Sequence, residues 1–150
     1  MNKSKRSTSE SAALNTFIKL MRATESVSSD VHRQITASGL SISQFGILEA
    51  LYHLGPMAQK DLAEKILKSA GNITMVIDNL EKQGLVVRDR NDLDRRSFII
   101  SPTIKGEALI ADILPQHAER IKKRMSSLTL KEQQTLGRLL KKLGQSTEKP

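Results

Sequence analysis

Apolar residues along the N-terminal part of the chain fall three and four positions apart, the spacing that places them on one face of an α-helix. A helix is therefore predicted from about Ser9 to Ala37, with Gly39 as its stop. Its apolar stripe begins with Leu14, Phe17, Ile18 and Met21 and continues with Val27, Val31 and Ile35.

Two shorter helices are predicted next. Ser41 and Gln44 have the spacing of a capping box, in which each side chain bonds to the other's backbone. The helix that they open ends at Gly55, and its apolar side chains are Phe45, Leu48, Leu51 and Tyr52. A third helix is predicted from about Ala58 to Leu67.

The most regular amphipathic pattern predicts a fourth helix, with Ser69 as its N-cap and Gly84 as its stop. Its apolar positions follow at i, i+3, i+4 and i+7 and are Ile73, Val76, Ile77 and Leu80. Its opposite face carries Asn72, Met75, Asn79 and Lys82.

Two short segments rich in β-branched residues, 85–90 and 97–101, are predicted to form a β-hairpin. Between them lies RNDLDRRSF, residues 90–98, which holds three arginines and two aspartates. Pro102 is expected to end the second strand, because proline has no backbone N–H.

Helical patterns return after the hairpin. Thr103 can cap a helix that runs to Leu114, where Pro115 is expected to kink or restart it. Thr129 and Glu132 form a second capping box. The helix that follows has an apolar stripe made of Leu136, Leu139, Leu140 and Leu143.

This order of elements predicts a mainly α-helical fold with one small β-hairpin, of the α+β class. Three short helices followed by a hairpin is the layout of a winged helix-turn-helix, in which the helix before the hairpin enters the DNA major groove. That helix needs short polar groups on its exposed face to reach base edges and phosphates. Residues 69–83 fit, although any surface helix has one apolar and one polar face.

Composition narrows the class of protein. The 150 residues suit one domain, and an aromatic content of 3% with no Trp indicates an aliphatic core of packed helices. The absence of Cys excludes disulfides, thiolate metal sites and cysteine nucleophiles. No apolar run reaches the roughly 20 residues that span a bilayer. Residues 1–8 resemble a frayed basic tail rather than a signal peptide, so we expect a cytoplasmic protein without a membrane partner.

The net charge of +8 indicates an anionic partner, with nucleic acid as the first candidate. The excess lies mostly in residues 119–150, which hold nine basic and three acidic side chains. The segment 90–98 has a net charge of only +1. Total charge is therefore weaker evidence than the position of particular arginines.

The charged segment between the two strands has two interpretations. As a wing, it would lie along the DNA backbone, with Asp94 holding Arg96 extended by a charge-assisted bond. As an ordinary solvated loop, its ion pairs would contribute little to stability.

The segment LEKQGLVVRDRNDLDRRSFIISPTIKGEAL resembles the signature of MarR-type transcriptional regulators. In that signature a recognition helix ends in LEKxGL, a wing reads D-x-D/R-R, and S-x-T-x-x-G starts the next helix. SQFGILEAL and KDLAEKI, which start at Ser43 and Lys60, are similar to the second and third helices of the family. The resemblance covers about residues 10–145.

The resemblance implies a homodimer that binds a pseudo-palindromic operator in double-stranded DNA, usually as a repressor. It implies one domain over residues 9–145, with a DNA-binding lobe over about 41–101 and dimerisation helices over about 9–38 and 103–145. Both apolar stripes at the chain ends would then lie in the dimer interface: Leu14, Phe17, Ile18 and Met21, with Leu136, Leu139, Leu140 and Leu143.

The resemblance also implies which residues meet DNA. Arg96 would enter the minor groove, Asp94 would orient it, and Arg95 and Arg90 would contact phosphates. The recognition-helix positions are Ser69, Gly71, Asn72, Thr74, Met75 and Asn79.

The sequence departs from the family pattern at three places. Met75 and Asn79 stand where arginine is frequent, which favours an A·T-rich or shape-read site. Asn91 and Asp92 replace a common Asp-Pro pair, which predicts a less stiff wing tip. Pro102 replaces a frequent leucine and is expected to shorten the strand pairing.

Members of the family often bind small aromatic or phenolic compounds between the dimer helices and the DNA-binding lobe. The residues of this chain that could line such a pocket are His32, Ile35, Phe45, Leu48, Tyr52 and His117. Plain core packing is the alternative interpretation of each of them.

An enzyme is disfavoured, because the sequence has no G-x-S-x-G, Walker or H-E-x-x-H motif and its three histidines lie far apart. We expect no cofactor and no metal. The remaining alternative is a dimeric winged-helix module that binds proteins without recognising an operator.

Overall fold

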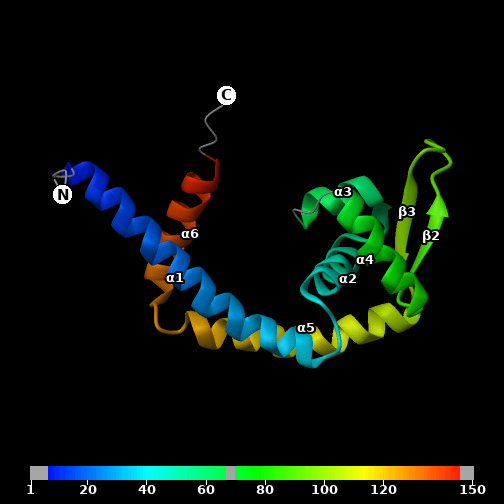
Figure 1. Cartoon of the computed structure of the whole chain (residues 1–150). Helices are drawn as coiled ribbons and strands as arrows, with labels where there is room; N and C mark the ends of the chain where they lie inside the picture. Colours follow the sequence, from blue (N-terminus) through cyan, green and yellow to red (C-terminus); the bar gives the residue numbers. More distant parts are fainter. Residues whose placement is uncertain (1–6, 67–69, 146–150) are drawn as a thin grey trace, which may run out of the picture.

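A computed structural model describes residues 7–66 and 70–145 of the chain, and it is mostly helical with one small sheet (Figure 1). In chain order the elements are α1 (Thr8–Ala37), α2 (Ile42–Leu54), β1 (Met57–Ala58), α3 (Gln59–Lys65), α4 (Ala70–Lys82), β2 (Val86–Arg90), β3 (Phe98–Pro102), α5 (Ile104–Met125) and α6 (Leu130–Gln145).

The long helices α1 and α5 run side by side and connect two ends of the molecule (Figure 1). At one end, α2, α3, α4 and the sheet form a lobe, and at the other end lies α6. Most of the buried residues belong to the lobe, including Leu48, Leu62, Ile77 and Ile100, which are essentially inaccessible to solvent. The predicted mainly α-helical class with a small β element is confirmed.

Side-chain caps fix the starts of several helices, as predicted. Ser41 and Gln44 form the reciprocal capping box of α2. Thr129 and Glu132 form another at the start of α6. The bond from the Thr129 backbone N–H, and then the one from its side chain, lower the pKa of the Glu132 carboxyl. Ser7 caps α1, so this helix begins one residue earlier than predicted.

The sheet has three antiparallel strands in the order β1-β3-β2, whereas only the β2–β3 hairpin was predicted. Met57 and Ala58 form β1 by pairing with Ile100 and Ile99. The predicted start of the third helix at Ala58 was therefore wrong by one residue, because Ala58 pairs in the sheet and α3 begins at Gln59. A strand of two residues is too short to show any alternation in the sequence.

The two prolines follow the predictions only in part. Pro102 ends β3, as predicted. Pro102 does not cut the hairpin short, because it is the last residue of β3 and pairs with Val86. It lies beyond the part of β3 that β1 also flanks, where a missing N–H costs little. At Pro115 the prediction was a kink or a restart of the helix. The restart is wrong, because α5 is continuous from Ile104 to Met125, and the kink stays a prediction. Ile113, buried just before the proline, helps to hold α5 in place.

Candidate nucleic-acid interface

Helix α4 presents a polar face to solvent on the lobe. Its apolar positions Ile73, Ile77 and Leu80 are buried in the core. The predicted recognition residues Asn72, Thr74, Met75 and Asn79 are exposed, Met75 by 63%. Gly71 lies in the first turn of α4, and Ser69 lies outside the described residues.

Gln59, at the start of α3, braces the exposed face of α4. Its side-chain amide donates a hydrogen bond to the hydroxyl of Thr74 at 2.8 Å. Gln59 was not predicted as a site residue, because the sequence places it in a segment with no binding motif. The bond fixes α3 against the N-terminal half of the recognition helix.

Arg88, on β2, joins the wing to α4. Its guanidinium donates to the Asp78 carboxylate at 2.7 Å and lies 5.6 Å from the centre of the Phe98 ring. The sequence prediction missed Arg88. The signal was its position two residues after the buried Val86, since alternate residues of a strand point to the same face.

The wing turn is held by short hydrogen-bonded links rather than by ion pairs. A carboxylate oxygen of Asp94 accepts from the backbone N–H of Arg96 at 3.0 Å. Among the described residues no ion pair joins the two side chains, and Asp94 bonds to the backbone of Arg96 instead of to its guanidinium as predicted. The stretch is a turn, and its geometry directs the carboxylate to the backbone.

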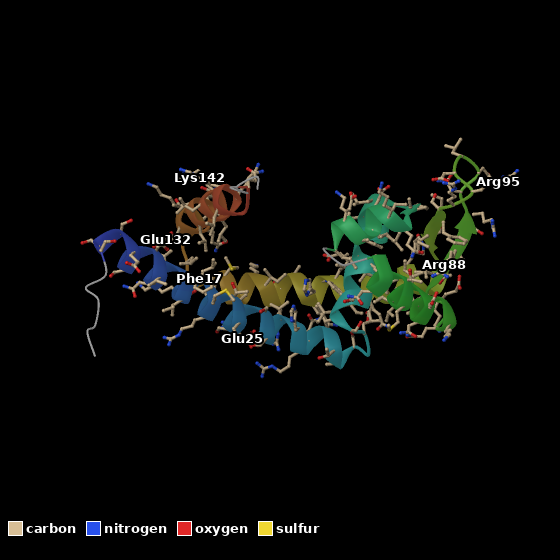
Figure 2. All side chains as sticks on the ribbon, turned by 45° about the horizontal axis from the view of Figure 1, so that its top comes forward. Phe17, Glu25, Arg88, Arg95, Glu132 and Lys142 are labelled. Carbon is tan, nitrogen blue, oxygen red and sulfur yellow. The ribbon has the colours of Figure 1, made fainter. Side chains whose placement is uncertain are left out.

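Asn91 braces the same turn. Its side-chain oxygen accepts from the Leu93 N–H, its amide donates to the Ser97 hydroxyl, and its own N–H donates to the Ser97 carbonyl. These three bonds constrain the wing tip, and the prediction of a less stiff tip did not take them into account. Arg90, Arg95 and Arg96 are exposed around the braced turn, and Arg95 lies at the far end of the wing (Figure 2).

A hollow of about 770 Å³ opens between α3, α4 and the wing. It brings together groups from three separate segments: Gln59, Lys60, Ala63, Glu64, Ile73, Thr74, Arg88, Arg96, Ser97 and Phe98. Among the described lining residues, Lys60 and Arg96 supply positive charge and Glu64 negative charge, while Arg88 is already paired with Asp78. Basic side chains beside a polar helix face suit a nucleic-acid backbone.

The start of α5 is held by hydrogen bonds to the two residues that follow α4, Gln83 and Gly84. The Thr103 hydroxyl donates to the Gly84 carbonyl at 2.6 Å, and the Lys105 ammonium donates to the Gln83 carbonyl at 2.8 Å. Gly106 packs so closely on Leu85 that an added Cβ would overlap the Leu85 carbonyl oxygen. These contacts hold the first turn of α5 against the residues that directly follow α4.

Both apolar stripes at the chain ends are uncovered in the single chain. All eight residues are between 37% and 58% exposed: Leu14, Phe17, Ile18, Met21, Leu136, Leu139, Leu140 and Leu143. An apolar hollow of about 540 Å³ lies between α1 and α6. Phe17 and Lys142 mark this end of the molecule, opposite the wing (Figure 2). On α1 the apolar lining of this hollow is Leu20, Ala23 and Val27, and the four stripe residues of α1 lie outside it. Exposed apolar stripes of this kind are typical of an interface.

The six positions predicted to line a ligand pocket separate into two groups. Ile35, Phe45 and Leu48 are buried members of the core, and the Phe45 ring lies 4.7 Å from the half-buried ring of His117. His32 and Tyr52 are exposed, and the Tyr52 ring packs edge-on against His53. The structure thus brings Phe45 and His117 together and places Ile35 and Leu48 in ordinary core packing.

Residues 7–66 and 70–145 contain no group of three acidic, histidine or cysteine side chains that could hold a metal ion. Within the same ranges, no helix has the length and apolar character needed to cross a membrane.

Comparison with known proteins gives consistent matches. The model of the MarR family matches residues 40–98. The chain is 36% identical to the HTH-type transcriptional regulator MhqR of Bacillus subtilis, over 88% of this chain and 91% of that protein. Bordetella bronchiseptica BpsR, whose DNA binding is regulated by 6-hydroxynicotinic acid, is 25% identical with a TM-score of 0.77, over 87% of this chain and 98% of that one.

The fold also matches a regulator that was solved on DNA. Sco3205 from Streptomyces coelicolor, a MarR family transcriptional regulator in complex with DNA, superposes with a TM-score of 0.83. The match covers 99% of this chain and 94% of that one, at 19% identity. At that identity the likeness supports the winged helix-turn-helix fold.

Proposed function

The chain belongs to the MarR family of transcriptional regulators, and we propose that it represses transcription as a homodimer bound to a pseudo-palindromic operator in double-stranded DNA. Regulators of this family are not enzymes, and the proposed function includes no catalytic step. In this proposal the protein acts in the cytoplasm, where it would meet the DNA that it binds.

The observation that carries the proposal is the hollow shared by α3, α4 and the wing. It places Arg96 of the wing and Thr74 of α4 on one surface. In this proposal α4 enters the major groove with Asn72, Met75 and Asn79 toward base edges. Met75 offers an apolar contact to thymine methyl groups, which favours A·T-rich sites. Arg96 enters the adjacent minor groove, while Arg90 and Arg95 contact phosphates.

The dimer of the proposal would cover the exposed apolar stripes of α1 and α6. Two copies related by a two-fold axis present two recognition helices, which suits an operator with two half-sites. Substitution of Phe17 or Leu139 by glutamate should therefore weaken this dimer.

The proposal includes release of the operator by a small aromatic or phenolic ligand. BpsR, whose DNA binding is regulated by 6-hydroxynicotinic acid, supports this part. The site would lie near the Phe45 and His117 rings, with His32 and Tyr52 on its solvent side. Such a ligand acts through different affinities for two dimer geometries that set different separations of the recognition helices.

Selection of bound fragments from genomic DNA tests the core of the proposal. A two-fold motif is the expected result, and binding to it should weaken steeply with salt, with a slope of about −0.9 per neutralised phosphate. Recovery of no common motif, with salt-independent association with proteins instead, would favour the protein-interaction alternative.

A further inference from the structure

Asp30, on α1, is surrounded by three arginines at the place where α1 and α5 run side by side (Figure 1). Arg33 comes from α1 itself, and Arg120 and Arg124 come from α5. Their nitrogen atoms lie 3.6, 3.7 and 3.8 Å from the Asp30 carboxylate oxygens. Arg124 also donates to the hydroxyl of Ser26 at 2.8 Å.

These ion pairs are loose. All three distances exceed the range of a direct charge-assisted hydrogen bond, which is about 2.7–2.9 Å. The Arg88–Asp78 pair, at 2.7 Å, lies inside that range. The side-chain Nε atoms of Arg120 and Arg124 are shielded from solvent and have no hydrogen-bond partner. The guanidinium groups therefore retain donors that Asp30 does not satisfy.

The charge at this place is unbalanced. A hollow of about 490 Å³ is lined by Ser26, Ser29, Asp30, Arg33, Arg120, Lys123 and Arg124. Four cationic side chains thus face a single carboxylate, and two hydroxyl groups complete the lining. The Asp30 carboxylate offsets only one of these four charges, and the remaining positive charge favours the binding of a further anion.

We propose that this hollow, which we call the arginine hollow, binds a small molecule that carries a phosphate group. A phosphate monoester carries close to two negative charges and three strong acceptor oxygens. It would therefore offset most of the excess positive charge and accept hydrogen bonds from arginines that approach from different sides.

The arginine hollow is separate from the hollow beside the wing and from the proposed aromatic-ligand site. It is polar and cationic, whereas the latter centres on the Phe45 and His117 rings. It also bridges α1 and α5. The other end of α5 is hydrogen-bonded through Thr103 and Lys105 to the residues that follow α4. A bound phosphate would hold α1 against α5 by contacting arginines of both helices.

Isothermal titration of the full chain with inorganic phosphate, at constant ionic strength against chloride, tests the proposal. We expect saturable binding. Arg33→Gln and Lys123→Gln should each weaken it by about tenfold, the scale of one charge-assisted bond. Both side chains are well exposed, so the substitutions leave the core intact.

Lys122→Gln is the matched control, because it removes the same charge from the neighbouring residue. Lys122 pairs with Glu119 at 3.7 Å and does not line the hollow, so phosphate affinity should stay at the wild-type value. Arg95→Gln, on the wing, should also leave it unchanged. Absence of saturation would overturn the proposal. So would equal weakening by Lys122→Gln, or a loss confined to Arg95→Gln, which would place the phosphate on the wing.

Discussion

Arg88 of β2 donates a hydrogen bond of 2.7 Å to Asp78 of α4 and so ties the wing to the recognition helix. The Arg88 side chain is only 18% exposed, and the Phe98 ring lies beside it. The angle between wing and helix decides whether both reach DNA together. This pair is therefore expected to matter for binding as well as for stability.

Asp78→Ala should lower the free energy of unfolding by about 1 kcal/mol, because it leaves the largely buried Arg88 guanidinium without its carboxylate. This expected loss is smaller than that for a fully buried ion pair, because the Asp78 side chain is 45% exposed and screened by solvent. Urea denaturation at a fixed protein concentration measures it. The control is Asp89→Ala, which removes an exposed carboxylate from the same strand as Arg88. Equal effects of the two substitutions would contradict the role given to the pair.

Arg96→Ala should weaken operator binding by about 1–3 kcal/mol, the scale of one good specific contact. The Arg96 side chain is exposed, so the fold and the dimer should be unaffected. A gel-shift titration on a selected operator gives the affinity, and sedimentation gives the oligomeric state. Unchanged affinity would remove Arg96 from the interface.

Asp94→Asn should bind the operator almost as well as the wild type, whereas Asp94→Ala should bind several-fold more weakly. The reason is that Asp94 accepts from the backbone N–H of Arg96, and an asparagine oxygen can accept the same bond. If Asp94 instead worked as a negative charge on the guanidinium, the two substitutions would be equally harmful. The same gel-shift titration separates these outcomes.

The helices were predictable from sequence because their periodicity and caps are local. Ser41 with Gln44 and Thr129 with Glu132 are each three residues apart, so both capping boxes could be predicted before any tertiary contact was known. The pairing of Met57 with Ile100 and the bond from Arg88 to Asp78 join segments that only the folded chain brings together. A bond between Asp94 and Arg96 was predictable from their spacing. Its acceptance from the backbone N–H of Arg96 depends on the geometry of the folded turn.

Gly106→Ala should lower the free energy of unfolding by about 1–3 kcal/mol, the usual cost of overpacking. The added methyl group would overlap the Leu85 carbonyl oxygen, a backbone atom that cannot rotate away. Because Gly106 packs α5 against Leu85, close after α4, the substitution should also shift α4 and lower operator affinity. Gly137→Ala, in a helical position with open space around it, is the control and should raise stability by about 0.5–1 kcal/mol. Urea denaturation that ranks the two substitutions alike would contradict this close packing.

The chain should sediment as a dimer at micromolar concentration, at twice the 16.7 kDa of one chain. Phe17→Glu and Leu139→Glu should each shift it toward the monomer, because each would bury an unpaired carboxylate in the apolar face of α1 and α6. Ile104→Glu is the matched control: Ile104 is 89% exposed at the start of α5, away from that face. A wild-type monomer would undercut the two-fold operator model, since one copy presents one recognition helix. Dissociation by Ile104→Glu as well would instead place the interface elsewhere on the chain.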